Sequence, residues 1–167
     1  MNLIPNPLHP ALVHFPIVLI LLGTVVAVAA VMIRRWHLPW LAAVLLGMGA
    51  LGAVAATWSG EEDAEGDKGR SAQAGQVLEE HEEWGERARN LALLAAAAAV
   101  TAAMLRRFPK ASTGVAVLTA LAAVGASFCV AEAGHYGGKL VYEHGIGVNL
   151  DSAKTGGTPA PSRKDDD

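Results

Sequence analysis

Four long apolar runs divide the sequence, and each is long enough to cross a membrane as a helix. They cover about residues 11–33, 38–59, 84–105 and 111–133. A helix needs roughly 20 apolar residues to cross the hydrocarbon core of a bilayer, and it satisfies its own backbone hydrogen bonds there. The runs are rich in Ala, Leu and Val and lack the alternation of strands. We therefore predict an all-α integral membrane four-helix bundle, formed by a single domain over residues 1–150.

The composition excludes a soluble helical protein. Hydrophobic residues make up 52% of the chain and charged residues only 17%. The charges are gathered into short segments between the apolar runs, whereas a soluble bundle would spread them along every helix. The net charge of -3 includes no basic excess, so nucleic acid is not an expected partner.

The charged connections predict the orientation in the membrane. The two short connections, residues 34–37 and 106–110, contain Arg and Lys and no acidic residue, whereas the connection 60–86 is strongly acidic. Basic loops stay on the cytoplasmic side of a membrane. We therefore expect both termini and the acidic connection on the outer side of a bacterial inner membrane that the chain crosses several times.

The third run is short for a span, and its helix is predicted to extend outward to about residue 75. Apolar or small residues recur there at helical spacing, whereas charged residues occupy the opposite face. The apolar stripe contains Val77, Leu78, His81, Trp84 and Ala88. This pattern predicts that His81 lies on the buried side of an amphipathic helix.

Histidine is the residue type that most suggests chemistry in this chain. Five of the six histidines fall in the half that we expect on the outer side, namely His9, His14, His81, His135 and His144. They come from separate helices but from one depth. Ionisable residues inside a membrane are costly and tend to mark functional sites, and cofactor sites in helical bundles are built from side chains on facing helices.

Our leading hypothesis is a membrane redox protein that holds b-type haem near the outer face. Imidazole is a common axial ligand of haem iron. The protein would pass electrons from a membrane donor such as quinol to an outer-side carrier such as a cytochrome c. The candidate haem ligands are His14, His81, His135 and His144.

Two further hypotheses remain open. The first is a zinc or copper site for metal binding or transport, because imidazole and carboxylate also bind these ions. Its candidate ligands are His14, His81, His135, His144, His9 and Glu132, with Glu143 as an alternative carboxylate. The second is a structural subunit of a larger complex or of a homo-oligomer, in which small residues make the helix contacts. The sequence contains no hydrolase, phosphate-binding or zinc-protease motif.

Several short motifs together resemble a known family. Similar proteins are the bacterial membrane proteins grouped as domain of unknown function 2231, and the resemblance runs from about residue 6 to 150. It implies a four-helix membrane fold without an established activity. Some relatives look joined to, or encoded beside, cytochrome c-like domains, which would suit a redox role. The motifs are His9-Pro10, His14-Phe15-Pro16-Ile17, Thr57-Trp58-Ser59-Gly60, His81 and the block 137–148.

Two details complete these expectations. Similar proteins often have Thr-Gly where this chain has Thr57-Trp58, so the resemblance assigns no role to Thr57. Residues 151–167 contain Gly, Pro, Ser and charged residues without a large apolar one, which predicts a disordered tail on the outer side.

Overall fold

The structure is a computed structural model that describes residues 9–33, 35, 37–66 and 71–146. The predicted tail at 151–167 lies outside these residues. The described chain is helical and contains four long helices that could each cross a membrane by length and composition. The elements are α1 (His9–Leu12), α2 (His14–Ile33), α3 (Leu38–Gly66), α4 (Ala72–Met104), the short 3₁₀ helix η1 (Leu105–Arg107) and α5 (Pro109–Tyr142).

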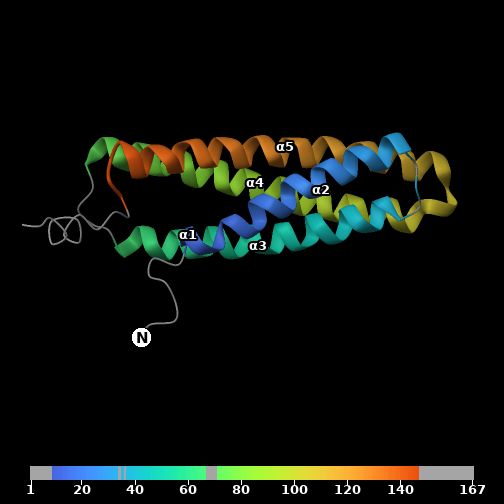
Figure 1. The fold of residues 1–167 in the computed structure, drawn as a ribbon, viewed down its shortest axis with the longest axis horizontal. Coiled ribbons are helices and arrows are strands. Elements are labelled where there is room, and N and C mark those ends of the chain that lie inside the picture. The colour runs from blue at the N-terminus through green and yellow to red at the C-terminus, as the bar shows by residue number, and fades with distance from the viewer. Residues whose placement is uncertain (1–8, 34, 36, 67–70, 147–167) are drawn as a thin grey trace, which may run out of the picture.

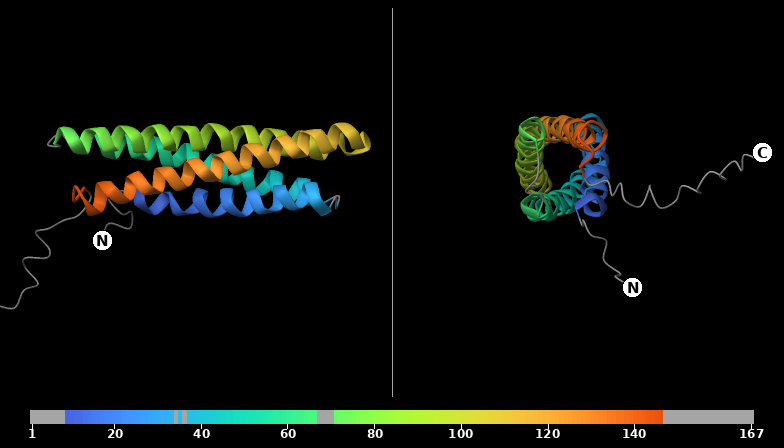
Figure 2. Two further views of the ribbon diagram at one scale, coloured as in Figure 1. Left: turned by 90° about the horizontal axis from the view of Figure 1, so that it is seen from above. Right: turned by 90° about the vertical axis from the view of Figure 1, so that its left-hand side faces the viewer.

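The four long helices run side by side and form a square ring (Figures 1 and 2). Helix α2 packs against α3 and α5, and α4 packs against the same two helices. One end of the bundle carries α1, the end of α3 and the start of α4, and we call it the histidine end. The other end carries the connections that contain Arg35 and η1, and we call it the arginine end. The prediction of an all-α, multi-pass four-helix bundle is thus confirmed.

The interior of the bundle is built mainly from alanine, and its surface from larger apolar residues. Ala92, Ala95 and Ala123 are fully buried, whereas Leu51 and Val25 are 70% and 67% exposed. In water this arrangement would be inside out. In lipid it is favourable, because small residues let helix backbones approach closely while large apolar side chains face the acyl chains.

Glycine provides the closest contacts between α2 and α3. A Cβ atom at Gly23 would lie 2.8 Å from the side chain of Leu46, and one at Gly49 would lie 2.9 Å from the side chain of Ile20. Leu46 and Ile20 are the largest fully buried side chains of the described chain. Each of the two helices therefore offers a glycine where the other inserts a large residue.

A proline separates α1 from α2. Pro16 has no backbone N–H, so no hydrogen bond can form to the carbonyl of Leu12 and the helix is interrupted at Val13. Hydrogen bonds from Val13 to His9 and from Ile17 to Val13 continue the chain across the break. Helix α1 is thereby turned against α3 (Figure 1), which places His9 between helices.

The helices at the histidine end are longer than the sequence indicated. Helix α3 continues to Gly66 instead of ending near residue 59, and α5 continues to Tyr142 instead of ending near residue 133. The glycines at 134, 137 and 138 lie inside α5 and do not form a turn. Helix α4 begins after Ser71, whose hydroxyl accepts a hydrogen bond from the backbone of Ala74. The bundle therefore projects beyond the apolar spans at this end.

The two halves of the chain bury their helices at equivalent positions. Every buried residue of α2 has a buried counterpart in α4 exactly one repeat of 72 residues later. The buried residues of α2 are Pro16, Ile20, Gly23, Ala27 and Ala30, and their counterparts are Ala88, Ala92, Ala95, Ala99 and Ala102. The bundle is thus two similar helical hairpins, α2–α3 and α4–α5, that lie in parallel and face each other.

Candidate functional site: a histidine pair

Two histidines from the two halves of the chain meet at the histidine end. The imidazole rings of His9 in α1 and His81 in α4 lie with their centroids 5.9 Å apart and their planes at 90°. Both side chains are half-buried. The stripe that predicted a buried side of α4 is confirmed, since Ala88 is buried and Glu80, Glu83 and Arg87 are exposed.

His9 is held by the backbone of α3. Its Nδ1 atom lies 2.8 Å from the carbonyl oxygen of Ala56 and 3.3 Å from the hydroxyl of Ser59. Ser59 is buried, and its hydroxyl donates to the same carbonyl at 3.0 Å. The ring also packs on Gly60, where a Cβ atom would lie 3.1 Å from Cε1 and from Nδ1. The ring therefore lies against a stretch of helix that has no side chain.

His81 is held by the backbone of α5 in the same manner. Its Nδ1 atom lies 2.8 Å from the carbonyl oxygen of Ala133. The ring packs on Gly137, where a Cβ atom would lie 3.1 Å from Cε1 and 3.3 Å from Nδ1. Both histidines thus bind a carbonyl that lies four residues before a glycine.

These hydrogen bonds define the tautomer of both rings. A carbonyl oxygen can only accept a hydrogen bond, so each Nδ1 atom carries the proton and donates it. In a neutral imidazole the lone pair then lies on Nε2. Histidines that bind metals commonly have this arrangement, with the second ring nitrogen donating to a backbone carbonyl. The pair therefore has the chemistry of two oriented nitrogen ligands.

The other predicted ligands lie elsewhere at the same end. His14 is exposed, His144 and Glu132 are half-buried, and His135 is exposed beside the ring of Tyr136, with 5.5 Å between the centroids. His135 lines a shallow surface groove of about 310 Å³ on α5. No three His, Cys, Asp or Glu side chains of the described ranges come close enough to hold a metal ion together. The predicted sharing of one cofactor by these residues stays a prediction.

Polar and aromatic side chains of α4 surround the pair on the side toward the membrane. Arg87 stacks over the ring of Trp84, 4.7 Å from its centroid, and forms an ion pair with Glu83 at 2.6 Å. Arg89 donates to the hydroxyl of Thr57 on α3 at 3.3 Å. Thr57, to which the resemblance gave no role, therefore helps to anchor an arginine between α3 and α4.

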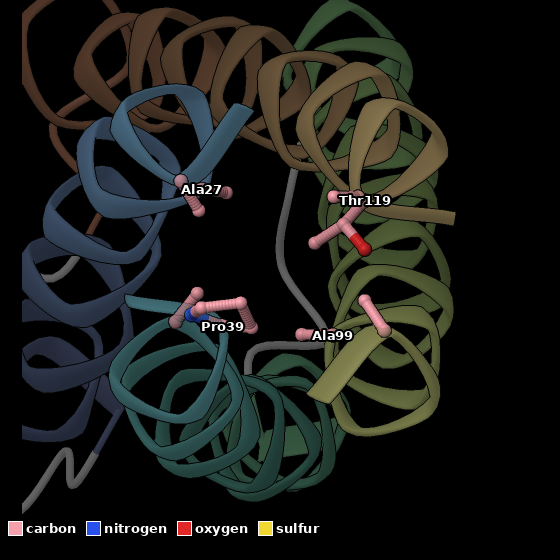
Figure 3. A pocket seen from close by; sticks show the side chains of 8 residues that line it. Ala27, Pro39, Ala99 and Thr119 are labelled. Atoms are coloured by element: carbon pink, nitrogen blue, oxygen red, sulfur yellow. The ribbon is translucent and has the colours of Figure 1, made fainter. Parts of the chain in front are cut away.

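The arginine end contains only a small apolar cavity within the described part of the bundle. It has a volume of about 10 Å³ and is lined by all four long helices, including Ala27, Pro39, Ala99 and Thr119 (Figure 3). The hydroxyl of Thr119 is already bonded to the carbonyl of Val115. Such a volume holds at most about one water molecule, so this cavity is a packing gap.

The importance of Gly60 and Gly137 was not recognised from the sequence, although a signal was present. His81 follows His9 by 72 residues, and Arg106-Arg107-Phe108 follows Arg34-Arg35-Trp36 by the same 72. This internal repeat pairs the two histidines and, at the ends of the hairpins, the two glycines. A comparison of the halves would have selected His9 and His81 together.

Comparison with known proteins supports the fold and leaves the activity open. The family model described as predicted membrane protein DUF2231 matches residues 5–150. No curated protein and no solved structure matches the chain. The match covers the four long helices and both histidines of the pair, and so confirms the resemblance found in the motifs. The chain therefore belongs to the DUF2231 family of predicted membrane proteins.

Proposed function

We propose that this membrane protein binds one transition-metal ion, copper or zinc, through the Nε2 atoms of His9 and His81. The observation that carries the proposal is the contact between two imidazoles that are each fixed by a backbone carbonyl. Imidazole is a good ligand for both metals. The remaining coordination positions would be filled by water or by a substrate.

The separation of the rings fits a shared ion. Metal–nitrogen bonds are about 2.0 Å long, so two imidazoles on one ion have their centroids about 5 to 6 Å apart. The centroids of His9 and His81 are 5.9 Å apart. Metal binding would therefore need rotation of the rings at most, without movement of the helices.

The same geometry favours an ion over a haem. A porphyrin held between these rings would extend sideways toward the helices on which the rings pack. A Cβ atom at Gly137 would lie 4.0 Å from Nε2 of His81, so the backbone of α5 is close to the ligand atom itself. A compact ion requires no such space.

We place this site on the outer side of the membrane. The basic residues Arg35, Arg106, Arg107 and Lys110 lie at the arginine end, and basic residues remain in the cytoplasm. At that position a copper ion would exchange electrons with outer-side carriers, such as a cytochrome c, or with quinol at the membrane surface. A zinc ion would serve binding or delivery without redox chemistry.

Metal analysis of the purified full-length protein tests the proposal. We expect one copper or zinc ion per chain after incubation with the metal and removal of excess. His9→Ala and His81→Ala should each lose it, whereas His37→Ala, at the arginine end, should keep it.

Four outcomes would contradict the proposal. The first is that no ion binds to the wild-type protein. The second is a bound ion that persists in both His9→Ala and His81→Ala. The third is a Soret absorption band, which would replace the ion by haem. The fourth is loss of the metal in His135→Ala but not in His81→Ala, which would move the site to the surface of α5.

A further inference from the structure

We infer that Gly60 and Gly137 are positioning residues of this metal site, and that they make its two halves equivalent. The inference rests on the proposed function. Each glycine leaves bare a backbone carbonyl that orients one imidazole, so that both Nε2 atoms are set in place before the ion arrives.

The first step concerns the surface of a helix. A side chain in an α-helix points toward the N-terminus and covers the turn before its own Cα atom. A glycine therefore uncovers the preceding turn, including the carbonyl four residues earlier. The carbonyls of Ala56 and Ala133 lie four residues before Gly60 and Gly137, and they are the two that accept from the histidines.

The second step concerns contact. At both glycines a Cβ atom would lie 3.1 Å from Cε1 of the imidazole that packs there. This is closer than a methyl group and a ring carbon normally approach, so alanine would push the ring away from the helix. The displaced ring would lose its short bond to the carbonyl, and its Nε2 atom would move with it.

The third step concerns the symmetry of the hairpins. Ala133 and Gly137 of α5 correspond to Ala56 and Gly60 of α3, just as His81 of α4 corresponds to His9 of α1. The same hydrogen bond, at the same 2.8 Å, occurs in both halves. The ion would therefore lie between two equivalent ligands, and loss of either orienting contact should weaken binding to a similar extent.

Substitution by alanine tests the inference. We expect Gly60→Ala and Gly137→Ala each to weaken metal binding by about 10- to 100-fold, as is usual when a partner that orients a ligand is lost. The matched controls are Gly47→Ala in α3 and Gly114→Ala in α5, because a Cβ atom at either position would meet nothing within 4 Å. Both controls should bind as the wild type does. Thermal unfolding of the metal-free variants shows whether the bundle is intact.

A spectroscopic measurement tests the same inference without any variant. Nitrogen-15 NMR of histidine in the metal-free protein should show His9 and His81 with the proton on Nδ1. A proton on Nε2 in either ring would overturn the inference, because the carbonyl would not then accept a hydrogen bond from Nδ1.

The two proposals fail in different ways. Wild-type protein that binds no ion removes the proposed function and the inference together. Wild-type affinity in Gly60→Ala and Gly137→Ala, combined with loss in His9→Ala and His81→Ala, overturns the inference alone.

Discussion

The hydroxyl oxygens of Thr24 and Ser127 lie 2.9 Å apart and link α2 to α5 inside the apolar bundle. Thr24 also lies within hydrogen-bonding distance of the carbonyls of Ile20, at 2.8 Å, and of Ala123, at 3.0 Å. Its single proton can serve these carbonyls, while its lone pairs accept from Ser127. This polar contact joins the first hairpin to the last helix of the second.

Removal of this contact should destabilise the bundle modestly. We expect Thr24→Val and Ser127→Ala each to lower the free energy of unfolding by about 0.6 to 1.7 kcal/mol, the range measured for hydrogen bonds between membrane helices. Titration with denaturing detergent, followed by circular dichroism, measures the change. Thr101→Val is the control, because Thr101 is exposed and bonds only to Ala97 of its own helix among the described partners. Equal effects at Thr24 and Thr101 would show that the link between helices contributes nothing.

Two neighbouring glycines of α3 should respond to alanine with opposite signs. At Gly49 a Cβ atom would lie 2.9 Å from Cγ1 and 3.2 Å from the backbone nitrogen of Ile20. The backbone cannot move away easily, so Gly49→Ala should cost about 1 to 3 kcal/mol of unfolding free energy by overpacking. Gly47→Ala meets nothing and should gain up to about 1 kcal/mol from helix propensity. The same detergent titration measures both, and stabilisation by Gly49→Ala would refute the close packing of α2 on α3.

Cysteine labelling should establish the orientation. Gln73 at the histidine end and Lys110 at the arginine end are both exposed. The native Cys129 is buried, so it contributes little background. We expect Gln73→Cys to react with a membrane-impermeant maleimide in intact cells, and Lys110→Cys to react only after permeabilisation. The reverse pattern would place the histidine pair on the cytoplasmic side.

Ser59→Ala should leave metal binding nearly unchanged. The hydroxyl of Ser59 lies 3.3 Å from Nδ1 of His9, whereas the carbonyl of Ala56 lies at 2.8 Å. The shorter contact is the stronger hydrogen bond, and alanine leaves it in place. Metal titration of this variant, side by side with Gly60→Ala, measures the contribution of each contact. A larger loss in Ser59→Ala than in Gly60→Ala would assign the orienting role to the hydroxyl.

The sequence was sufficient to predict the fold, because the length of an apolar run and the energy of an unpaired backbone group in lipid leave few alternatives. It was less informative about the ends of the helices. Gly134, Gly137 and Gly138 suggested a turn as readily as a helix, yet α5 continues through them to Tyr142. Contact with the start of α4 stabilises this last part of the helix, and sequence-based propensity does not include such contacts.

The site was harder to predict because a sequence gives the depth of a residue better than its direction. His135 lies at the expected depth, but Ala133 and Gly137, two residues before and after it, face His81. Two residues correspond to about 200° around a helix, so His135 points away from the pair and is exposed. His9 was expected at the edge of the membrane, and it reaches the interior because α1 turns at Val13.

The repeat of 72 residues has a consequence for biogenesis. Each hairpin begins and ends at the histidine end and buries its own pair of helices, so each can be inserted by the translocation machinery as a separate unit. The gene could then be divided between α3 and α4, and the two polypeptides, produced together in one cell, should assemble into the complete bundle. Neither fragment alone would contain both imidazoles, which makes recovery of metal binding a direct measure of reassembly.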